Sequence, residues 1–259
     1  MKITVCELND REKKFKKDWE KLIHHVEKNK SDLVLLNEMP FGKWIASSKE
    51  VDDDLKAESF GIHNTWIKRI PEFNRAIVIY SKPVFKRGKL FNTAFVWTKE
   101  DGHKALHSKY YFPEEEHFYE ASWFDSQEKS FEIFEVRKIK IGVLICSELW
   151  MLEHARSYGL QGADIIVTPR ATGKKSVKQW LTCGQTAAMT SGAYSISSNR
   201  AGEGDDGFKW GGSGWVIRPG DGKIVGLTSG KEPFVTVKLN LKKASEAKQQ
   251  YPLNIHPRK

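Results

Sequence analysis

Short runs of apolar residues that end in a polar side chain constrain the fold of this chain most. Three of them are residues 33–36, 141–145 and 165–167. Strands that are apolar at every position are typical of a parallel sheet covered on both faces. Between such runs, apolar residues recur at helical spacing, as at Phe15, Trp19, Leu22, Ile23 and Val26. The pattern therefore predicts an α/β fold.

The same patterns predict further elements. Strands are expected at residues 3–5, 76–80, 92–97, 103–109, 131–136, 138–146, 164–168, 193–197, 215–218 and 224–227. Helices are expected at residues 11–30, 47–70, 152–161 and 176–191. The second of these helices begins with the capping box Ser47-x-x-Glu50. Residues 100–102 and 219–222 predict hairpin turns.

Length and composition bear on domain organisation and location. The 259 residues could form one large α/β domain or two smaller ones, and no linker rich in Pro, Gly or Ser divides them. We therefore expect a single domain over residues 1–259, with a basic C-terminal tail from about residue 242. The chain shows no secretion signal or membrane-spanning run, and its three cysteines are scattered. We expect a cytoplasmic protein without membrane association.

The formal net charge of +9 raises the question of nucleic-acid binding. The basic residues are spread along amphipathic helices and the C-terminal tail, and no nucleic-acid-binding motif accompanies them. Solvated helix faces explain this distribution better than a polyanion-binding surface does. No nucleic acid is therefore expected among the partners.

Three strand ends have side chains that suggest chemistry. Cys146 ends the strand at residues 138–146 and precedes a helical pattern. A thiol at such a turn lies at the carboxyl edge of the sheet, where open α/β proteins bind their ligands. Glu38 follows another apolar run, and Lys109 lies at the edge of a third strand. A buried strand-end cysteine is usually inert by itself, but the three groups together favour a catalytic site.

The sequence around these residues resembles the nitrilase, or carbon–nitrogen hydrolase, superfamily. The resemblance lies in Asn-Glu-Met-Pro at Glu38, His-Ser-Lys-Tyr-Tyr-Phe-Pro-Glu at Lys109, and Gly-Val-Leu-Ile-Cys at Cys146 followed by Glu-His-Ala-Arg. It continues in family order through residues 162–166, 198–202 and 212–217. It implies a four-layer αββα sandwich of two mixed β-sheets, and homodimers or higher homo-oligomers built across the helices that flank the sheets.

The resemblance implies a Glu-Lys-Cys triad. Cys146 would attack the substrate and form a thioester, and Glu38 would take the thiol proton in place of the histidine that usually has this role. Lys109 and the backbone N–H of Ser147 would stabilise the oxyanion. The same glutamate could protonate the departing ammonia or amine and later activate water.

A second carboxylate is expected beside Lys109, because it would help to keep the ammonium group protonated. In the family a glutamate has this position, and residues 118–124 resemble its segment. The resemblance therefore implies Glu120, with Glu114 as the alternative.

Aromatic residues beside the motifs indicate an apolar substrate pocket. Trp150, Phe41 and Tyr110 are the candidates, and plain packing explains Trp150 about equally well. Arg170 follows the strand at residues 164–168, whose carboxyl end should face the same cleft. It could bind a substrate carboxylate or pair with a structural acid, and both alternatives stay open.

No cofactor or metal ion is expected. His103 and His107 have H-x-x-x-H spacing, but on a strand four residues span roughly 13 Å, which is too far for a shared ion. The acidic run at residues 114–116 is better explained as a solvated face than as a metal site.

The leading hypothesis is a cysteine hydrolase that cleaves a small linear amide or ureide through a thioester and releases ammonia or an amine. Nitrile hydrolysis by the same triad is the alternative. Glu148 matches the Cys-Trp-Glu of authentic nitrilases, whereas Ser147 does not. A third hypothesis is a non-catalytic binding protein that retains the fold. The intact triad argues against it, because unpaired charges in a buried cleft are costly.

Overall fold

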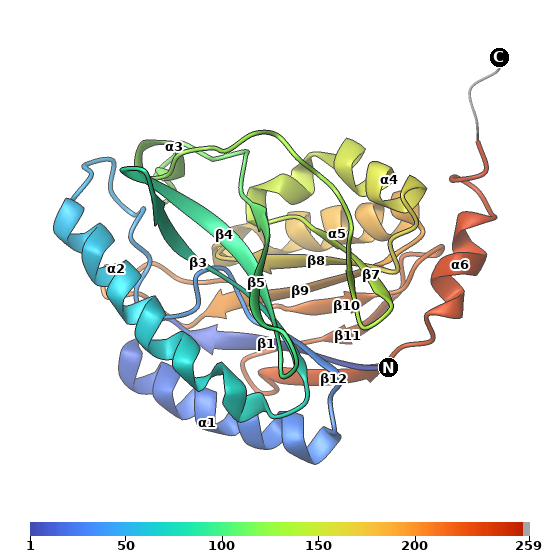
Figure 1. Ribbon diagram of the computed structural model, residues 1–259, viewed down its shortest axis with the longest axis horizontal. Helices are drawn as coiled ribbons and strands as arrows, with labels where there is room; N and C mark the ends of the chain where they lie inside the picture. Colours follow the sequence, from blue (N-terminus) through green and yellow to red (C-terminus); the bar gives the residue numbers. More distant parts are fainter. Residues whose placement is uncertain (256–259) are drawn as a thin grey trace.

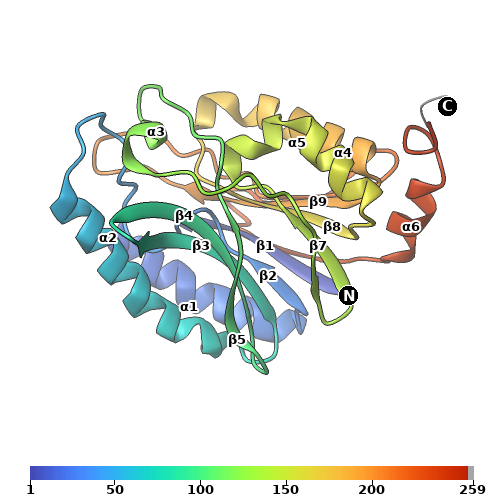
Figure 2. The same cartoon turned by 45° about the horizontal axis from the view of Figure 1, so that its top comes forward.

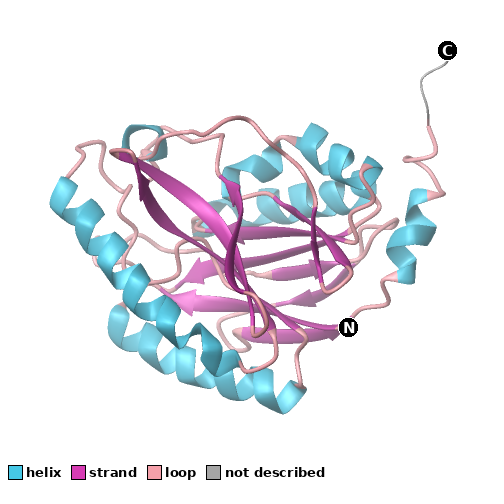
Figure 3. Cartoon of the chain, viewed as in Figure 1, coloured by secondary structure: helices cyan, strands magenta, loops and turns pink. Residues whose placement is uncertain are grey.

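The computed structural model describes residues 1–255, and Figures 1 and 3 show its helices and strands. The strands are β1 (Lys2–Asn9), β2 (Leu33–Leu35), β3 (Ile77–Lys86), β4 (Lys89–Thr98), β5 (Gly102–Ser108), β6 (Phe134–Val136), β7 (Ile139–Val143), β8 (Ile165–Arg170), β9 (Tyr194–Ala201), β10 (Trp215–Ile217), β11 (Ile224–Leu227) and β12 (Phe234–Lys238). The α-helices are α1 (Glu12–Asn29), α2 (Asp53–Trp66), α3 (Glu120–Trp123), α4 (Leu152–Leu160), α5 (Val177–Ser191) and α6 (Lys242–Lys248). The 3₁₀ helices are η1 (Ile67–Phe73), η2 (Cys146–Trp150) and η3 (Lys174–Ser176).

Strand β1 joins two mixed sheets, because its two halves pair with different neighbours. Residues 2–6 pair with β12 in the antiparallel direction, and residues 3–5 pair with β2 in the parallel direction. Residues 7–9 pair in parallel with β9 instead. The first sheet has the order β5-β4-β3-β2-β1-β12, and the second has the order β6-β7-β8-β9-β10-β11.

Helices cover the outer face of each sheet. Helices α1 and α2 contact β1 and β3 of the first sheet, and α5, which packs on α4, contacts β9 and β10 of the second. Figure 2 shows the two helix pairs on opposite sides of the molecule with the strands between them. Apolar side chains of both sheets, among them Leu35 and Val143, belong to one buried core. The expected four-layer αββα sandwich is confirmed.

Helix α1 illustrates how the sequence pattern produces these layers. Phe15, Trp19, Leu22 and Val26 recur every three or four residues, and all four are buried. They pack with the outward-facing side chains of β2 and β3 in one apolar cluster. Because buried aromatic and aliphatic side chains each contribute about 1.5–3 kcal/mol, this stripe fixes the helix on the sheet.

Two local expectations differ from the structure. Helix α2 begins at Asp53 rather than at a capping box, because the Asp52 carboxylate accepts hydrogen bonds from the backbone N–H groups of Asp54 (2.8 Å) and Leu55 (3.1 Å). Strand β7 ends at Val143, three residues before Cys146. Both expected hairpins are confirmed, since β4 pairs with β5 and β10 pairs with β11 in the antiparallel direction.

The C-terminal region contains two further elements, β12 and α6, that the sequence patterns did not predict. In α6, Ala244 and Ala247 are buried, and the Nζ atom of Lys248 donates to the carbonyl oxygens of Ala163 (2.6 Å) and Gly192 (3.1 Å). Residues 256–259 of the expected basic tail lie outside the described residues. Within residues 1–255, no helix combines the length and the apolar character that crossing a membrane requires.

Candidate active site

Strand ends from both sheets contribute to the candidate site. Glu38 lies three residues after β2, Lys109 directly follows β5, and Cys146 lies three residues after β7. The pairing directions make β2, β5 and β7 run the same way. Their carboxyl ends therefore lie at one edge of the molecule, where the two sheets meet.

Lys109 is the centre of a buried ionic network. Its Nζ atom lies 2.9 Å from Oε1 of Glu38, and 2.8 and 2.6 Å from the two carboxylate oxygens of Glu120. Asn92 on β4 donates from Nδ2 to the same Oε1 of Glu38 at 2.8 Å. Burial lowers the pKa of Lys109, but Glu120, Glu38 and Cys146 raise it by more, so that it lies above its usual value. The ammonium group therefore stays charged.

One oxygen of Glu38 remains available. Oε1 accepts from Lys109 and Asn92, whereas Oε2 is buried and has no hydrogen-bond partner among residues 1–255. Such an atom is costly unless something uses it. The carboxylate is thus held by one oxygen, and the other is free to accept a proton.

Cys146 occupies a tight left-handed turn at the start of η2, with φ of 47°. This backbone conformation costs a non-glycine residue about 1–3 kcal/mol. Reciprocal hydrogen bonds close the turn around it. The N–H of Glu148 donates to the carbonyl oxygen of Ile145 (3.1 Å), and the N–H of Ile145 donates to Oε2 of Glu148 (2.7 Å). The sulfur has one weak contact, with the carbonyl oxygen of Ala171 at 3.9 Å.

The charge states of the site follow from burial and from the neighbouring groups. Burial raises the pKa of the Cys146 thiol, Glu38 and Glu120 raise it further, and Lys109 lowers it, so that it lies well above its usual value. Burial also raises the pKa of Glu120, which Lys109 offsets in part. At neutral pH the thiol is therefore protonated in the resting site, and a nucleophilic attack by sulfur requires a base.

A cavity of about 170 Å³ opens at the sulfur. The residues that line it include Cys146, Glu120, Ser147, Trp150, Thr172 and Trp180. The ring of Trp150 is 45% exposed and meets Trp180 edge to face at 5.2 Å, so these two residues form the outer wall. Sites for drug-sized ligands have roughly 300–1,000 Å³. This cavity is therefore suited to a small substrate.

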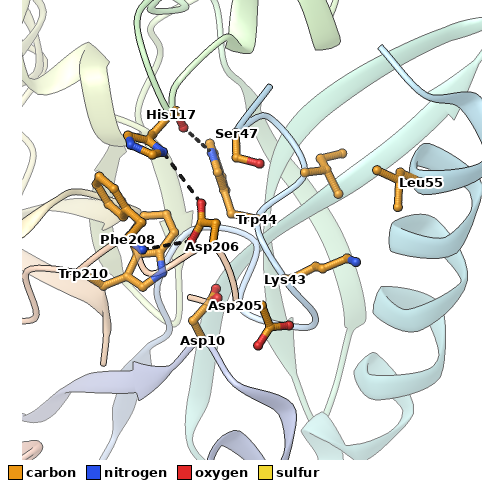
Figure 4. A pocket seen from close by; sticks show the side chains of 11 residues that line it. Asp10, Lys43, Trp44, Ser47, Leu55, His117, Asp205, Asp206, Phe208 and Trp210 are labelled. Atoms are coloured by element: carbon orange, nitrogen blue, oxygen red, sulfur yellow. Dashed lines mark hydrogen bonds and ion pairs between the residues drawn. The ribbon is translucent and has the colours of Figure 1, made fainter. Parts of the chain in front are cut away.

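A second cavity, of about 210 Å³, is shown in Figure 4. Two hydrogen bonds join residues that line it. The carbonyl oxygen of His117 accepts from Nε1 of Trp44 at 3.1 Å, and Asp206 accepts from the N–H of Phe208 at 3.0 Å. The residues that line it do not include Glu38, Lys109 or Cys146. We therefore place the candidate chemistry in the smaller cavity.

Two of the expected pocket residues lie elsewhere. Phe41 packs beneath α1 and α2, with its ring 5.5 Å from that of Trp19 and stacked on Trp66 at 5.9 Å. Tyr110 is half-buried, and its N–H donates to Oε1 of Glu148 at 2.8 Å. Neither lines the cavity at Cys146. Proximity to a motif in the sequence did not reveal which face of the chain their side chains occupy.

Arg170 is fully buried and binds neutral oxygen atoms. Its guanidinium donates to Oγ of Ser197 (2.7 Å), to Oγ1 of Thr172 (3.0 Å) and to the carbonyl oxygen of Ser213 (2.9 Å). It also lies 4.0 Å from the centroid of the Trp215 ring. Burial lowers the pKa of Arg170 to about 9. Among residues 1–255 Arg170 has no salt-bridge partner, and it does not line the cavity at Cys146.

Of the two candidate supporting carboxylates, Glu120 is the one at Lys109. The exposed Glu114 instead accepts hydrogen bonds from the N–H (3.1 Å) and Oγ (2.6 Å) of Ser122. The two histidines with H-x-x-x-H spacing, His103 and His107, have separate partners. His103 contacts the Tyr80 hydroxyl at 2.8 Å and His107 contacts Glu148. Residues 1–255 contain no group of three or more His, Cys, Asp or Glu side chains that could hold a metal ion.

Sequence reasoning missed Asn92 and the structural role of Glu148. Asn92 is a polar residue inside the otherwise largely apolar β4, and it is fully buried. Buried amides are almost always paired, so this position could have indicated a polar partner nearby. Glu148 matches a motif position in the sequence, but the motif does not indicate that this carboxylate is fully buried.

Comparison with known families decides the classification. Residues 2–249 match the model of the carbon-nitrogen hydrolase family. The chain belongs to this family. The protein is therefore an enzyme of the carbon–nitrogen hydrolase type, which acts on amide-like C–N bonds.

Individual relatives are distant. The N-carbamoylputrescine amidase of Arabidopsis thaliana is 24% identical over 194 residues, which cover 71% of this chain and 64% of that protein. The nitrilase of Pyrococcus abyssi is 24% identical over 219 residues, covering 84% of this chain and 80% of that protein. Among solved structures, a carbon-nitrogen hydrolase from Helicobacter pylori G27 has a TM-score of 0.86 at 23% identity. The match covers 98% of this chain and 94% of the Helicobacter pylori chain.

Proposed function

We propose that this hydrolase cleaves the C–N bond of a small linear amide or ureide, with Cys146 as the nucleophile, and releases ammonia or an amine. One observation carries the proposal. Lys109 holds the carboxylates of Glu38 and Glu120 in one buried network, and Glu120 lines the same small cavity as the Cys146 sulfur.

The first step is attack on the carbonyl carbon. Oε2 of Glu38, the free oxygen of that carboxylate, takes the thiol proton as the S–C bond forms. A base is required because burial and the nearby carboxylates raise the pKa of Cys146. Negative charge then develops on the substrate oxygen.

That oxyanion is stabilised by two donors. Lys109 has three N–H bonds, of which two suffice for Glu38 and Glu120, so that the third can donate to the oxyanion. The backbone N–H of Ser147 at the start of η2 is the second donor. A fixed ammonium group in a dry cavity stabilises such charge more than it would in water.

The remaining steps return the enzyme to its starting state. The protonated Glu38 transfers its proton to the nitrogen, the C–N bond breaks, and ammonia or an amine leaves a thioester on Cys146. Water then attacks the thioester, with Glu38 accepting a proton, and the carboxylic acid leaves as the thiol is restored. For an amide, the balance is amide plus water to acid plus amine.

The substrate class rests on cavity size and on the relatives. The volume of about 170 Å³ favours small, unbranched acyl groups. The relatives include plant proteins named N-carbamoylputrescine amidase, a name that denotes a ureide substrate. The alternative is nitrile hydrolysis by the same residues, since a relative is named nitrilase.

We also propose that the enzyme works in the cytoplasm as a homodimer or higher homo-oligomer. The cysteines Cys6, Cys146 and Cys183 are all free and buried, as expected in a reducing compartment. Two large apolar side chains, Trp150 and Leu160, are 45% and 64% exposed. Leu160 ends α4, and Trp150 lies just before α4 at the end of η2. Light scattering after size-exclusion chromatography measures the oligomeric state.

Ammonia release from a panel of small amides, ureides and nitriles tests the function, with Cys146→Ala as the blank. We expect release from at least one amide or ureide by the wild type and none by the variant. Intact-mass spectrometry of the wild type, quenched with acid during turnover of the same substrates, should detect an acyl adduct that Cys146→Ala lacks. Equal release by wild type and blank on every compound would overturn the proposal. Release from nitriles alone would replace it by the alternative.

A further inference from the structure

The carboxylate of Glu148 contacts both catalytic segments. Oε2 accepts from the N–H of Ile145 at 2.7 Å, directly before Cys146. Oε1 accepts from the N–H of Tyr110 at 2.8 Å, directly after Lys109. One side chain therefore binds the residue beside the thiol and the residue beside the ammonium group, although the two segments come from different sheets.

His107 supplies the third hydrogen-bond donor to the Glu148 carboxylate. Its Nε2 atom lies 3.0 and 2.8 Å from the two oxygens of Glu148, and the imidazole is itself packed on Phe131 with the ring centroids 4.9 Å apart. Glu148 is fully buried, and burying a carboxylate is costly unless its oxygens are bound. Three donors, two of them backbone N–H groups, satisfy it here.

The position of Glu148 has a geometric consequence. The turn at Cys146 has φ of 47° and closes through the reciprocal bonds between Ile145 and Glu148. The same carboxylate anchors the segment that follows β5, at Tyr110, the residue after Lys109. A second contact joins the segments, since Oγ of Ser147 donates to the carbonyl oxygen of Tyr111 at 2.6 Å. This contact does not involve the Glu148 carboxylate and does not close the turn at Cys146.

We propose that Glu148, oriented by His107, is a positioning residue that sets the separation between the Cys146 sulfur and the Lys109 ammonium group. The inference rests on the proposed function of these two residues. Glu148 touches neither substrate nor sulfur in this role. A change of about 1 Å in such a separation lowers turnover by about 100-fold, so its effect falls on kcat.

Glu148→Gln is the principal test. Glutamine keeps the shape, but its amide nitrogen cannot accept, so one of the two backbone N–H groups loses its partner. We expect a folded protein whose kcat is about 100-fold lower, with KM within about threefold of the wild type. The rate at which iodoacetamide alkylates Cys146 should fall as well. A kcat within about threefold of the wild type would overturn the inference.

Glu7→Gln is the matched control. Glu7 is another buried carboxylate, which accepts from the N–H of Ser213 (2.6 Å) and from Oγ1 of Thr228 (2.7 Å), and these contacts join no catalytic segments. We expect this variant to lower the midpoint of thermal unfolding while kcat stays within about threefold. Equal losses of kcat in both variants would reduce the effect at Glu148 to general destabilisation and refute the inference.

Two substitutions of His107 keep the inference testable if Glu148→Gln does not fold. His107→Ala removes the side-chain donor to Glu148, and we expect kcat to fall by about 10-fold. His107→Gln can still donate an N–H to the carboxylate and should restore most of that loss. Failure of the glutamine to restore activity contradicts the inference. An active Cys146→Ala variant, by contrast, would refute the proposed function, whatever the result at Glu148 or His107.

Discussion

Lys109 and Glu120 form a two-pronged buried ion pair, in which the Nζ atom lies 2.8 and 2.6 Å from the two carboxylate oxygens. Both side chains are at most 1% exposed. Because a buried ammonium group is stable only beside negative charge, Glu120 fixes the charge and the direction of Lys109.

Glu120→Gln should therefore lower kcat by about 100-fold, because the neutral amide no longer holds Lys109 in place. Glu114→Gln is the control. Glu114 is exposed, and its partners within residues 1–255 are the N–H and the hydroxyl of Ser122, so its variant should retain kcat within about twofold. Steady-state kinetics on the best amide or ureide measure both. If the Glu114 variant lost more activity than the Glu120 variant, the supporting carboxylate would be Glu114 and this prediction would be wrong.

Asn92→Ala should lower kcat by about 10-fold, because Nδ2 of Asn92 donates to Oε1 of Glu38 at 2.8 Å and a hydrogen bond to a charged group contributes about 1.5–3 kcal/mol. Without it, the Glu38 carboxylate is held by Lys109 alone and is less firmly oriented. Circular dichroism establishes that the variant is folded, and steady-state kinetics give kcat. Unchanged turnover in a folded variant contradicts this role.

Alkylation of Cys146 should show no plateau near neutral pH. Burial, with Glu38 and Glu120, raises the pKa of this thiol above the usual value of 9.0. The thiolate fraction therefore rises about tenfold per pH unit until the pH reaches the raised pKa. Iodoacetamide rates between pH 6 and 9 in the absence of substrate measure this dependence, with Cys146→Ala reporting any reaction at Cys6 and Cys183. A rate that levels off below about pH 7 would instead indicate a resting thiolate paired with Lys109.

Arg170→Met should reduce stability rather than change substrate preference. The guanidinium makes three hydrogen bonds to neutral oxygens and lies over the Trp215 ring. Their loss should lower the free energy of unfolding by about 3 kcal/mol, measured by urea denaturation. The ratio of kcat/KM between an acidic and a neutral amide of equal length should stay the same. A selective loss of the acidic substrate would show that Arg170 contacts a substrate carboxylate.

Apolar periodicity predicted much of the fold. The buried stripe of α1, the fully apolar β2 and the apolar first half of β8 follow from spacing alone, because each buries apolar side chains away from water. The predicted start of α2 is wrong. Ser47 and Asp52 are both suitable N-cap residues, and only the folded chain decides between them. Strand β12 was missed, because its burial depends on pairing with β1, more than 200 residues away in the sequence.

The site was partly predictable for a similar reason. Cys146, Glu38 and Lys109 stand at strand ends, and parallel strand ends meet at one edge. The resemblance also implied Glu120, which does contact Lys109. Phe41 and Asn92 show the limit. Which face Phe41 occupies, and which residue Asn92 meets across the sheet, depend on registers that no local pattern encodes.

The change of partners along β1 has a mechanical consequence. Residues up to Cys6 belong to the sheet that bears Glu38 and Lys109, and residues from Glu7 onward align with the sheet that bears Cys146. The register of β1 therefore sets how the two halves of the proposed reaction centre are aligned. Inserting one residue between Cys6 and Glu7 would slide one half past the other by about 3.3 Å. The alignment of sulfur and ammonium would then be lost, although neither residue had been altered.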